Sequence, residues 1–143
     1  MQQSMTNAYL TFKNLTMVNA ILLLLYGIGF IIIPENMLDY YGVSLSNDGD
    51  FITKLWGATY ISLAMIVWAI RDMEFSDIRK NISIGIIVGS GIGGILSLIN
   101  RFDDNTNANT LEWLNVFLYG IFAAGYAYFT FIETGEKKSE TSE

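Results

Sequence analysis

Three glycines in the sequence spell a pattern that could bind a phosphate. Gly89, Gly91 and Gly94 form G-x-G-x-x-G directly after an apolar run, and in a strand–turn–helix unit this pattern cradles the pyrophosphate of a dinucleotide. Such a site also needs a βαβ unit and usually an acidic residue about 20 residues further on. Here the apolar run continues through the glycines, and Asp103 follows too soon. We therefore expect no dinucleotide site and no other cofactor.

Small residues also recur along this stretch at the spacing of one helix face. Gly85, Gly89 and Gly93 are four residues apart, so on a helix they share a face and let a neighbouring backbone approach closely. The last apolar run of the chain offers a matching small surface. We predict that these two helices pack together, within one chain or between two copies, and that Gly89→Leu loosens the contact. The predicted packing residues are Gly85, Gly89, Gly93, Ser97, Gly120 and Ala124.

Amide and phenol side chains inside the apolar runs are the third set that could do chemistry. A polar group surrounded by hydrocarbon has to find a hydrogen-bond partner. One interpretation is that these groups join helices to each other, which is common between membrane helices. The other is that they frame a polar pocket for a small ligand. The pocket residues would then be Asn19, Tyr60, Asn115 and Tyr119.

Several kinds of chemistry are excluded or disfavoured by what the sequence lacks. It contains neither Cys nor His, which rules out thiolate nucleophiles, imidazole bases and sulfur or imidazole metal ligands. No Asp, Glu or Lys stands near the middle of an apolar run, although proton-coupled transporters generally place such a group there. The remaining acids and tyrosines form no recognisable acid–base pair. We therefore predict no catalytic residues and do not expect an enzyme.

Acidic residues gather in the loops that follow the first and third apolar runs. Oxygen ligands of this kind suit Ca²⁺ or Mg²⁺, but the calcium-loop spacing is missing, because Thr59 stands where the final Glu would be needed. A solvated acidic face is the simpler interpretation, and we predict no metal site. The net charge of −6 also argues against nucleic acid as a partner. The loop acids are Glu35, Asp39, Asp48, Asp50, Asp103, Asp104 and Glu112.

Four apolar runs dominate the chain and would have to position all of these side chains. Hydrophobic residues make up 52% of the sequence and charged residues only 15%, against about 25% charged in ordinary soluble domains. The runs cover residues 15–33, 52–70, 82–99 and 113–132. Each is long enough as a helix to cross a hydrocarbon core of roughly 30 Å, where only internally bonded backbone is stable. We predict an all-α fold: a four-helix transmembrane bundle in a single domain, 1–132.

The segments beside the first and last runs have their own patterns. Pro34 ends the first helix, and "PENMLDYY" predicts a short helix with Met37, Leu38 and Tyr41 on one face and Gly42 as its stop. We expect this helix to lie in the membrane interface. Residues 133–143 are too polar to pack, so we expect a disordered cytoplasmic tail.

The distribution of Lys and Arg predicts the orientation of the chain. Positive residues favour the cytoplasmic side of a bacterial-type plasma membrane. Only Lys54 and Arg101 belong to the loops at 34–51 and 100–112 or their edges. We therefore predict a multi-pass protein of the plasma membrane with both termini in the cytoplasm. The residues on the predicted cytoplasmic side are Lys13, Arg71, Arg79, Lys80, Lys137 and Lys138.

The order of these features resembles a known group of small membrane proteins. The first helix ends "GIGFIIIPENMLDYYGV", the second begins "FITKLWGATYISLAMIVWAI", the third is rich in glycine, and the fourth reads "WLNVFLYGIFAAGYAYF". Over residues 15–132 this is similar to the small bacterial and archaeal DoxX-like family. The resemblance implies a four-helix bundle that works beside other membrane proteins. Some members are associated with quinone-linked oxidation, but with no His or Cys here we carry over no catalytic residue.

Two functions are compatible with these patterns. The first is a non-catalytic accessory or structural subunit, which would pack through its helix surfaces and aromatic fourth helix against another membrane protein or a second copy. The second is a small transporter or ligand-binding membrane protein that uses the polar pocket. Both have the lipid bilayer as their principal surrounding.

Overall fold

The chain folds into helices that follow one another from end to end. The computed structural model describes residues 11–39, 41–44, 47–102 and 112–132, and these contain helices and turns but no strand. The predicted tail at 133–143 lies outside the described residues. The helices are α1 (Phe12–Ile32), α2 (Pro34–Asp39), α3 (Asn47–Ala69), α4 (Asp77–Phe102) and α5 (Glu112–Ala127), and α5 continues as a π-helix, η2 (Tyr128–Ile132).

Four of these helices are long and apolar enough to cross a membrane. They span Phe12–Ile32, Gly49–Ala69, Asp77–Phe102 and Glu112–Ile132. Their outward surfaces carry large apolar side chains; Leu25 is 59% exposed, Met65 64% and Phe117 70%. An apolar surface this extensive is stable against lipid and not against water. The prediction of an all-α fold with four helices long and apolar enough to span a membrane is confirmed, and this architecture is compatible with an integral membrane protein.

α1 and α4 begin earlier than their apolar runs because polar caps set their starts. The side chain of Thr11 accepts a hydrogen bond from the backbone N–H of Asn14 at 3.2 Å, which caps α1. Ser76 does the same for α4 by accepting from the N–H of Arg79 at 3.3 Å. Hydrophobicity marks where a helix can meet lipid, whereas a cap marks where the helix starts, and the two differ here by about one turn.

The short helix after Pro34 is present, and it ends in a glycine turn. The N–H of Val43 bonds to the carbonyl of Leu38 at 3.2 Å, and the N–H of Gly42 bonds to that of Asp39 at 3.0 Å. Gly42 has φ 69°, the left-handed conformation that this Schellman arrangement requires and that glycine adopts without strain. Leu38 is buried, and a Cβ on Gly29 would lie 2.9 Å from the Met37 sulfur, so α2 lies against the end of α1. The position of α2 in the membrane interface stays a prediction.

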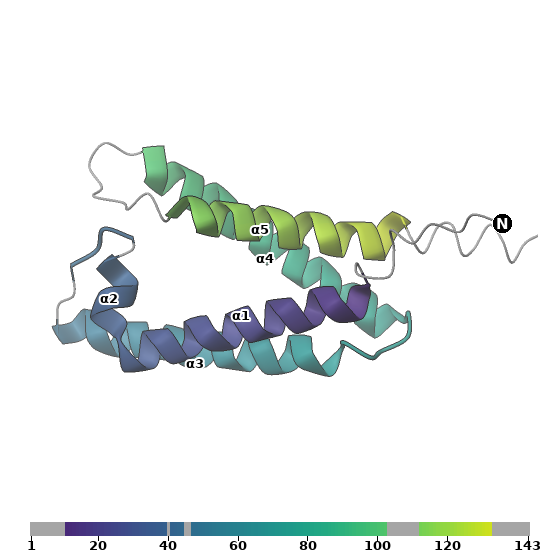
Figure 1. The fold of residues 1–143 in the computed structure, drawn as a ribbon, viewed down its shortest axis with the longest axis horizontal. Helices are drawn as coiled ribbons and strands as arrows, with labels where there is room; N and C mark the ends of the chain where they lie inside the picture. Colours follow the sequence, from purple (N-terminus) through teal and green to yellow (C-terminus); the bar gives the residue numbers. More distant parts are fainter. Residues whose placement is uncertain (1–10, 40, 45–46, 103–111, 133–143) are drawn as a thin grey trace, which may run out of the picture.

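The spanning helices pack as two pairs (Figure 1). α1 lies along α3, and α4 lies along α5. Within the first pair the backbones touch at Gly27 and Gly57, because a Cβ on Gly27 would lie 2.8 Å from the Gly57 carbonyl oxygen and a Cβ on Gly57 would lie 2.7 Å from the Gly27 oxygen. Glycine at both positions is therefore what allows these two helices to come so close.

The two pairs meet at one end of the molecule and separate towards the other. In Figure 1 the start of α1, the end of α5 and the connection from α3 to α4 lie together on the right of the view. The core sits there: Phe12 packs edge-on against Tyr126 and Phe129, with ring centroids 6.0 Å apart in both contacts. Leu15, Ile70 and Phe122 complete this cluster. At the opposite end, the first pair with α2 lies apart from the second pair.

Candidate functional site

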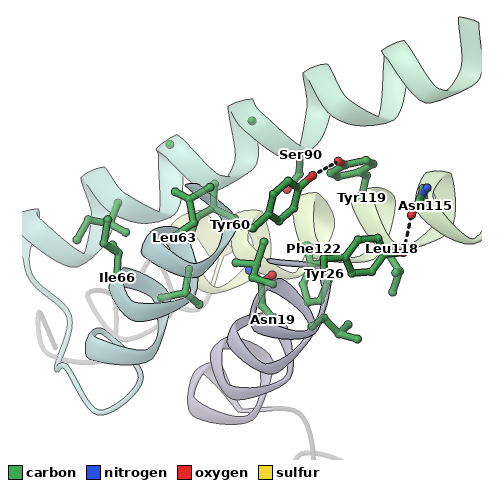
Figure 2. A pocket seen from close by; sticks show the side chains of 17 residues that line it. Asn19, Tyr26, Tyr60, Leu63, Ile66, Ser90, Asn115, Leu118, Tyr119 and Phe122 are labelled. Atoms are coloured by element: carbon green, nitrogen blue, oxygen red, sulfur yellow. Dashed lines mark hydrogen bonds between the residues drawn. The ribbon is translucent and has the colours of Figure 1, made fainter. Parts of the chain in front are cut away.

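A cavity of about 530 Å³ lies between the two helix pairs. All four spanning helices contribute to its wall (Figure 2). Most of the wall is aliphatic or aromatic, with side chains such as Leu22, Ile86 and Phe122. This volume falls within the roughly 300–1,000 Å³ typical of small-molecule sites, which are likewise mainly apolar with a few polar groups.

The four polar residues proposed from sequence for a pocket all line this one cavity. Asn19 comes from α1, Tyr60 from α3, and Asn115 and Tyr119 from α5. Asn115, Tyr119 and Phe122 reach it together because residues four and three apart share a helix face. The structure also adds Tyr26 and Ser90 to the polar part of the wall. Contact of any of these residues with a ligand stays a prediction.

Asn115 joins three segments of the chain through both ends of its amide. Its Oδ1 accepts from the Tyr26 hydroxyl of α1 at 2.7 Å, and its Nδ2 donates to the Tyr41 hydroxyl at 3.1 Å. Tyr41 lies in the turn after α2 and outside the spans. Burial raises the pKa of the Tyr41 phenol above its ordinary value. This network holds the two helix pairs together at the end where their backbones separate.

Asn19 makes the bond between helices that the first interpretation predicted, and it also lines the cavity. Its Nδ2 donates to the Tyr126 hydroxyl of α5 at 3.1 Å, and both side chains are buried. The bond therefore closes the inner end of the cavity, next to the aromatic core. Asn19 therefore fits both interpretations of the sequence, the bond between helices and the polar pocket.

Tyr60, Tyr119 and Ser90 form a group of hydroxyls on the cavity wall (Figure 2). The two phenol oxygens are 3.4 Å apart, and either can be the donor. Other hydroxyls in the spans, including those of Thr16, Thr59 and Ser62, donate to the carbonyl one turn back. Ser90 makes no such bond within the described residues. Its hydroxyl is available to the cavity.

The small residues predicted to pack α4 against α5 have different surroundings in the structure. A Cβ on Gly93 would lie 2.7 Å from the ring of Tyr119, and Ser97 is buried, so this part of α4 does lie against α5. By contrast, a Cβ on Gly85, Gly89 or Gly120 would meet no atom within 4 Å.

Gly85 and Gly89 line the cavity instead of touching a helix, and Gly120 and Ala124 are exposed on the outer face of α5. Within a single chain, a side chain at Gly85, Gly89 or Gly120 would meet no neighbouring helix, so the expected contact is not present at these three positions. The reason is that α5 crosses the α4 stripe near Gly93 and does not follow it towards Gly85. Packing of these residues between two copies stays a prediction.

The charged groups near the site lie at its ends and not on its wall. No Asp, Glu, Lys or Arg is among the residues that line the cavity. Glu112, which the sequence suggested for a solvated acidic face, is only 1% exposed and accepts a hydrogen bond from Asn100 at 2.8 Å. Its place as the first residue of α5 puts it on the inward face, one turn from Asn115.

Some of the remaining loop acids lie on the surface, and others fall outside the residues that the structure describes. Asp50 pairs with Lys54 at 2.6 Å on the surface, and Asp39 is exposed. Asp103 and Asp104 lie outside the described residues. No cluster of three acidic residues that could hold a metal ion occurs in the part of the chain that the structure describes.

Comparison with known proteins adds no relative to this picture. No protein-family model, curated protein or solved structure matches the chain. The resemblance to the DoxX-like group therefore stays a prediction, and the site has to be interpreted from its own geometry.

Proposed function

We propose that this integral membrane protein binds a small molecule in the cavity between its two helix pairs. The observation that carries the proposal is the shared wall: four spanning helices each contribute residues to one volume of about 530 Å³, and the polar ones converge on it. Small-molecule sites have this composition, with apolar walls for affinity and a few hydrogen-bonding groups for orientation. Amides, phenols and a serine hydroxyl supply that orientation here.

The arrangement favours binding over catalysis. The polar groups on the wall are Asn19, Tyr26, Tyr60, Ser90, Asn115 and Tyr119. None of them is a carboxylate, ammonium or imidazole, which are the groups that most often exchange protons with a substrate. Their hydrogen bonds instead hold the helices together, and a few hydroxyls remain that could bind a ligand. We place the protein in the plasma membrane with both termini in the cytoplasm, because Lys13, Arg71 and Arg79 lie at the end that holds the core.

Comparison of two glycine variants on α4 tests this function directly. A leucine at Gly89 would project into the cavity without meeting backbone, whereas a leucine at Gly91 would meet equally open space away from it. We expect protein purified from native membranes in mild detergent to retain a small molecule in stoichiometric amount, as detected by native mass spectrometry. Gly91→Leu should retain it and Gly89→Leu should lose it. Equal retention by both variants would show that the molecule binds outside the cavity, which would contradict the proposal.

The outer face of α5 supports a second candidate, the accessory subunit. Phe117 and Ile121 are exposed there, at 70% and 47%, around the exposed Gly120 and Ala124. Small residues bordered by aromatic side chains let a helix of another membrane protein approach closely. A stoichiometric protein partner, or a second copy, should then co-purify with the wild type and be lost from Gly120→Leu. Unchanged co-purification, or no partner at all, counts against this role.

A further inference from the structure

Hydroxyl donors without a partner are concentrated at one place on the cavity wall. Asn115 uses both ends of its amide, and the Asn19 Nδ2 is bonded to Tyr126. The pair formed by Tyr60 and Tyr119 needs only one of its two protons, so the other O–H is free to donate. Ser90 adds a second hydroxyl without a partner in the described chain. Figure 2 shows the three side chains on the same part of the wall.

These unused hydroxyl donors favour a hydrogen-bond acceptor on the ligand. A hydroxyl that donates to nothing in a low-dielectric environment is costly, so an oxygen acceptor placed between Ser90 and the two phenols would be favourable. A charged ligand would not be favoured, because no residue that lines the cavity carries an opposite charge and a buried unpaired charge is strongly disfavoured. The aliphatic part of the wall, such as Leu22 and Ile86, fits a hydrocarbon body.

The cavity is open on the side between α3 and α4. α1 contacts both α3 and α5, and α4 contacts α5, but α3 makes no comparable contact with α4 or α5 in the described residues. Leu63 and Ile66 of α3 line the cavity and are nevertheless 44% and 46% exposed. Opposite them, Gly85 and Gly89 of α4 have no side chain that could close the gap. Both helices are apolar spans, so this opening faces hydrocarbon.

We infer that the ligand is a neutral molecule dissolved in the bilayer, with a hydrocarbon body and an ester, ether or alcohol oxygen. It passes between α3 and α4 and accepts hydrogen bonds from Ser90 and from the Tyr60–Tyr119 pair. This inference rests on the binding function proposed above and adds the class of ligand and its route. A water-soluble or ionic ligand would have to cross lipid to reach the same opening.

Photoreactive lipid probes that differ only in their head group test this inference. The protein is reconstituted in phosphatidylcholine vesicles with a long alkyl chain that carries a diazirine and ends in a methyl ester, a phosphate or a trimethylammonium group. After irradiation, labelled peptides are identified by mass spectrometry. We expect the methyl ester to label residues of α3 and α4 that line the cavity, at least several-fold more than either charged probe.

Hydroxyl deletions test the proposed contacts. Ser90→Ala removes a group with no partner in the described chain, so it should leave the melting temperature unchanged and lower ester labelling about fivefold, the loss expected for one net hydrogen bond. Removing both phenol hydroxyls in the Tyr60→Phe, Tyr119→Phe double variant should lower it similarly, because either single variant leaves one O–H free to donate. The matched control is Tyr128→Phe, because Tyr128 belongs to the end of the same span but does not line the cavity. Its labelling should equal that of the wild type.

The possible results separate this inference from the proposed function. Equal or stronger labelling of the cavity by a charged probe, with labelling abolished in Gly89→Leu, would overturn the neutral class while leaving the binding function intact. Wild-type ester labelling in Ser90→Ala and in the Tyr60→Phe, Tyr119→Phe double variant would overturn the hydroxyl contacts. If no probe labels the wild type more than Gly89→Leu, with Gly91→Leu as control, then the cavity binds none of them and both proposals fail.

Discussion

Asn19 and Asn115 illustrate how far single residues can be interpreted from the sequence. An amide in an apolar run must be bonded, which predicts that it points inward, and the structure places both residues on the same cavity as Tyr60 and Tyr119. The partners could not be predicted. Tyr41 lies outside the runs, in the turn after α2, and bonds to Asn115 of α5. The burial of Glu112 was likewise missed, since a helix's first residue has no fixed face until its neighbour is known.

The Asn19–Tyr126 hydrogen bond should contribute measurably to stability. We expect Asn19→Ala to lower the free energy of unfolding in detergent by about 0.6–2 kcal/mol, the range for polar bonds between membrane helices. Because both groups are buried, Tyr126→Phe should have a similar effect. In a double-mutant cycle, the two substitutions together should cost less than the sum of the single ones. Simple additivity would show that the two side chains do not interact.

At the scale of helices, apolar length predicted the four spans well, because lipid permits few alternatives to a helix of that length. The same spacing argument could not decide which glycines touch another backbone. Gly85 and Gly89 have regular spacing, yet they face a cavity, whereas Gly27 and Gly57 form the close contact between α1 and α3. A stripe of small residues permits a close approach, but the packing of the other helices determines whether one occurs.

Two alanine substitutions should therefore have opposite effects on stability. In Gly57→Ala the new Cβ would come within 2.7 Å of the Gly27 carbonyl oxygen, which is backbone and cannot move aside. We expect a loss of about 1–3 kcal/mol, as for other overpacked sites. In Gly85→Ala the Cβ meets nothing within 4 Å, so the higher helix propensity of alanine should leave stability unchanged or raised by up to about 1 kcal/mol. Unfolding in detergent measures both, and equal losses would contradict the assigned contacts.

At the scale of the whole molecule, two helix pairs are closed at one end by an aromatic core and joined at the other by Tyr26, Asn115 and Tyr41. The separation of the pairs creates the cavity, and no local pattern in the sequence encodes that separation. Charged residues lie at the end that holds the core. Lys13 pairs there with Asp72 at 2.6 Å, and the Lys13 ammonium lowers the pKa of the Asp72 carboxyl. This end is the one that we predict to face the cytoplasm.

Single cysteines measure that orientation cleanly because the chain contains none of its own. Glu35 in α2 and Glu74 in the connection between α3 and α4 are both exposed, at opposite ends of the spans. In intact cells, a membrane-impermeant maleimide should label Glu35→Cys and not Glu74→Cys, while both should react after the membrane is broken. The reverse pattern would invert the chain and place both termini outside.

The central claim is that the polar side chains of the spans enclose a cavity for a ligand within the bilayer. The most direct test is an experimental structure of the protein in a lipid nanodisc made from native membranes. We predict elongated ligand density between α3 and α4, with its polar end against Ser90, Tyr60 and Tyr119. A structure in which α3 is packed along α4 with Gly85 and Gly89 at the contact, and with no space left between the helix pairs, would contradict it.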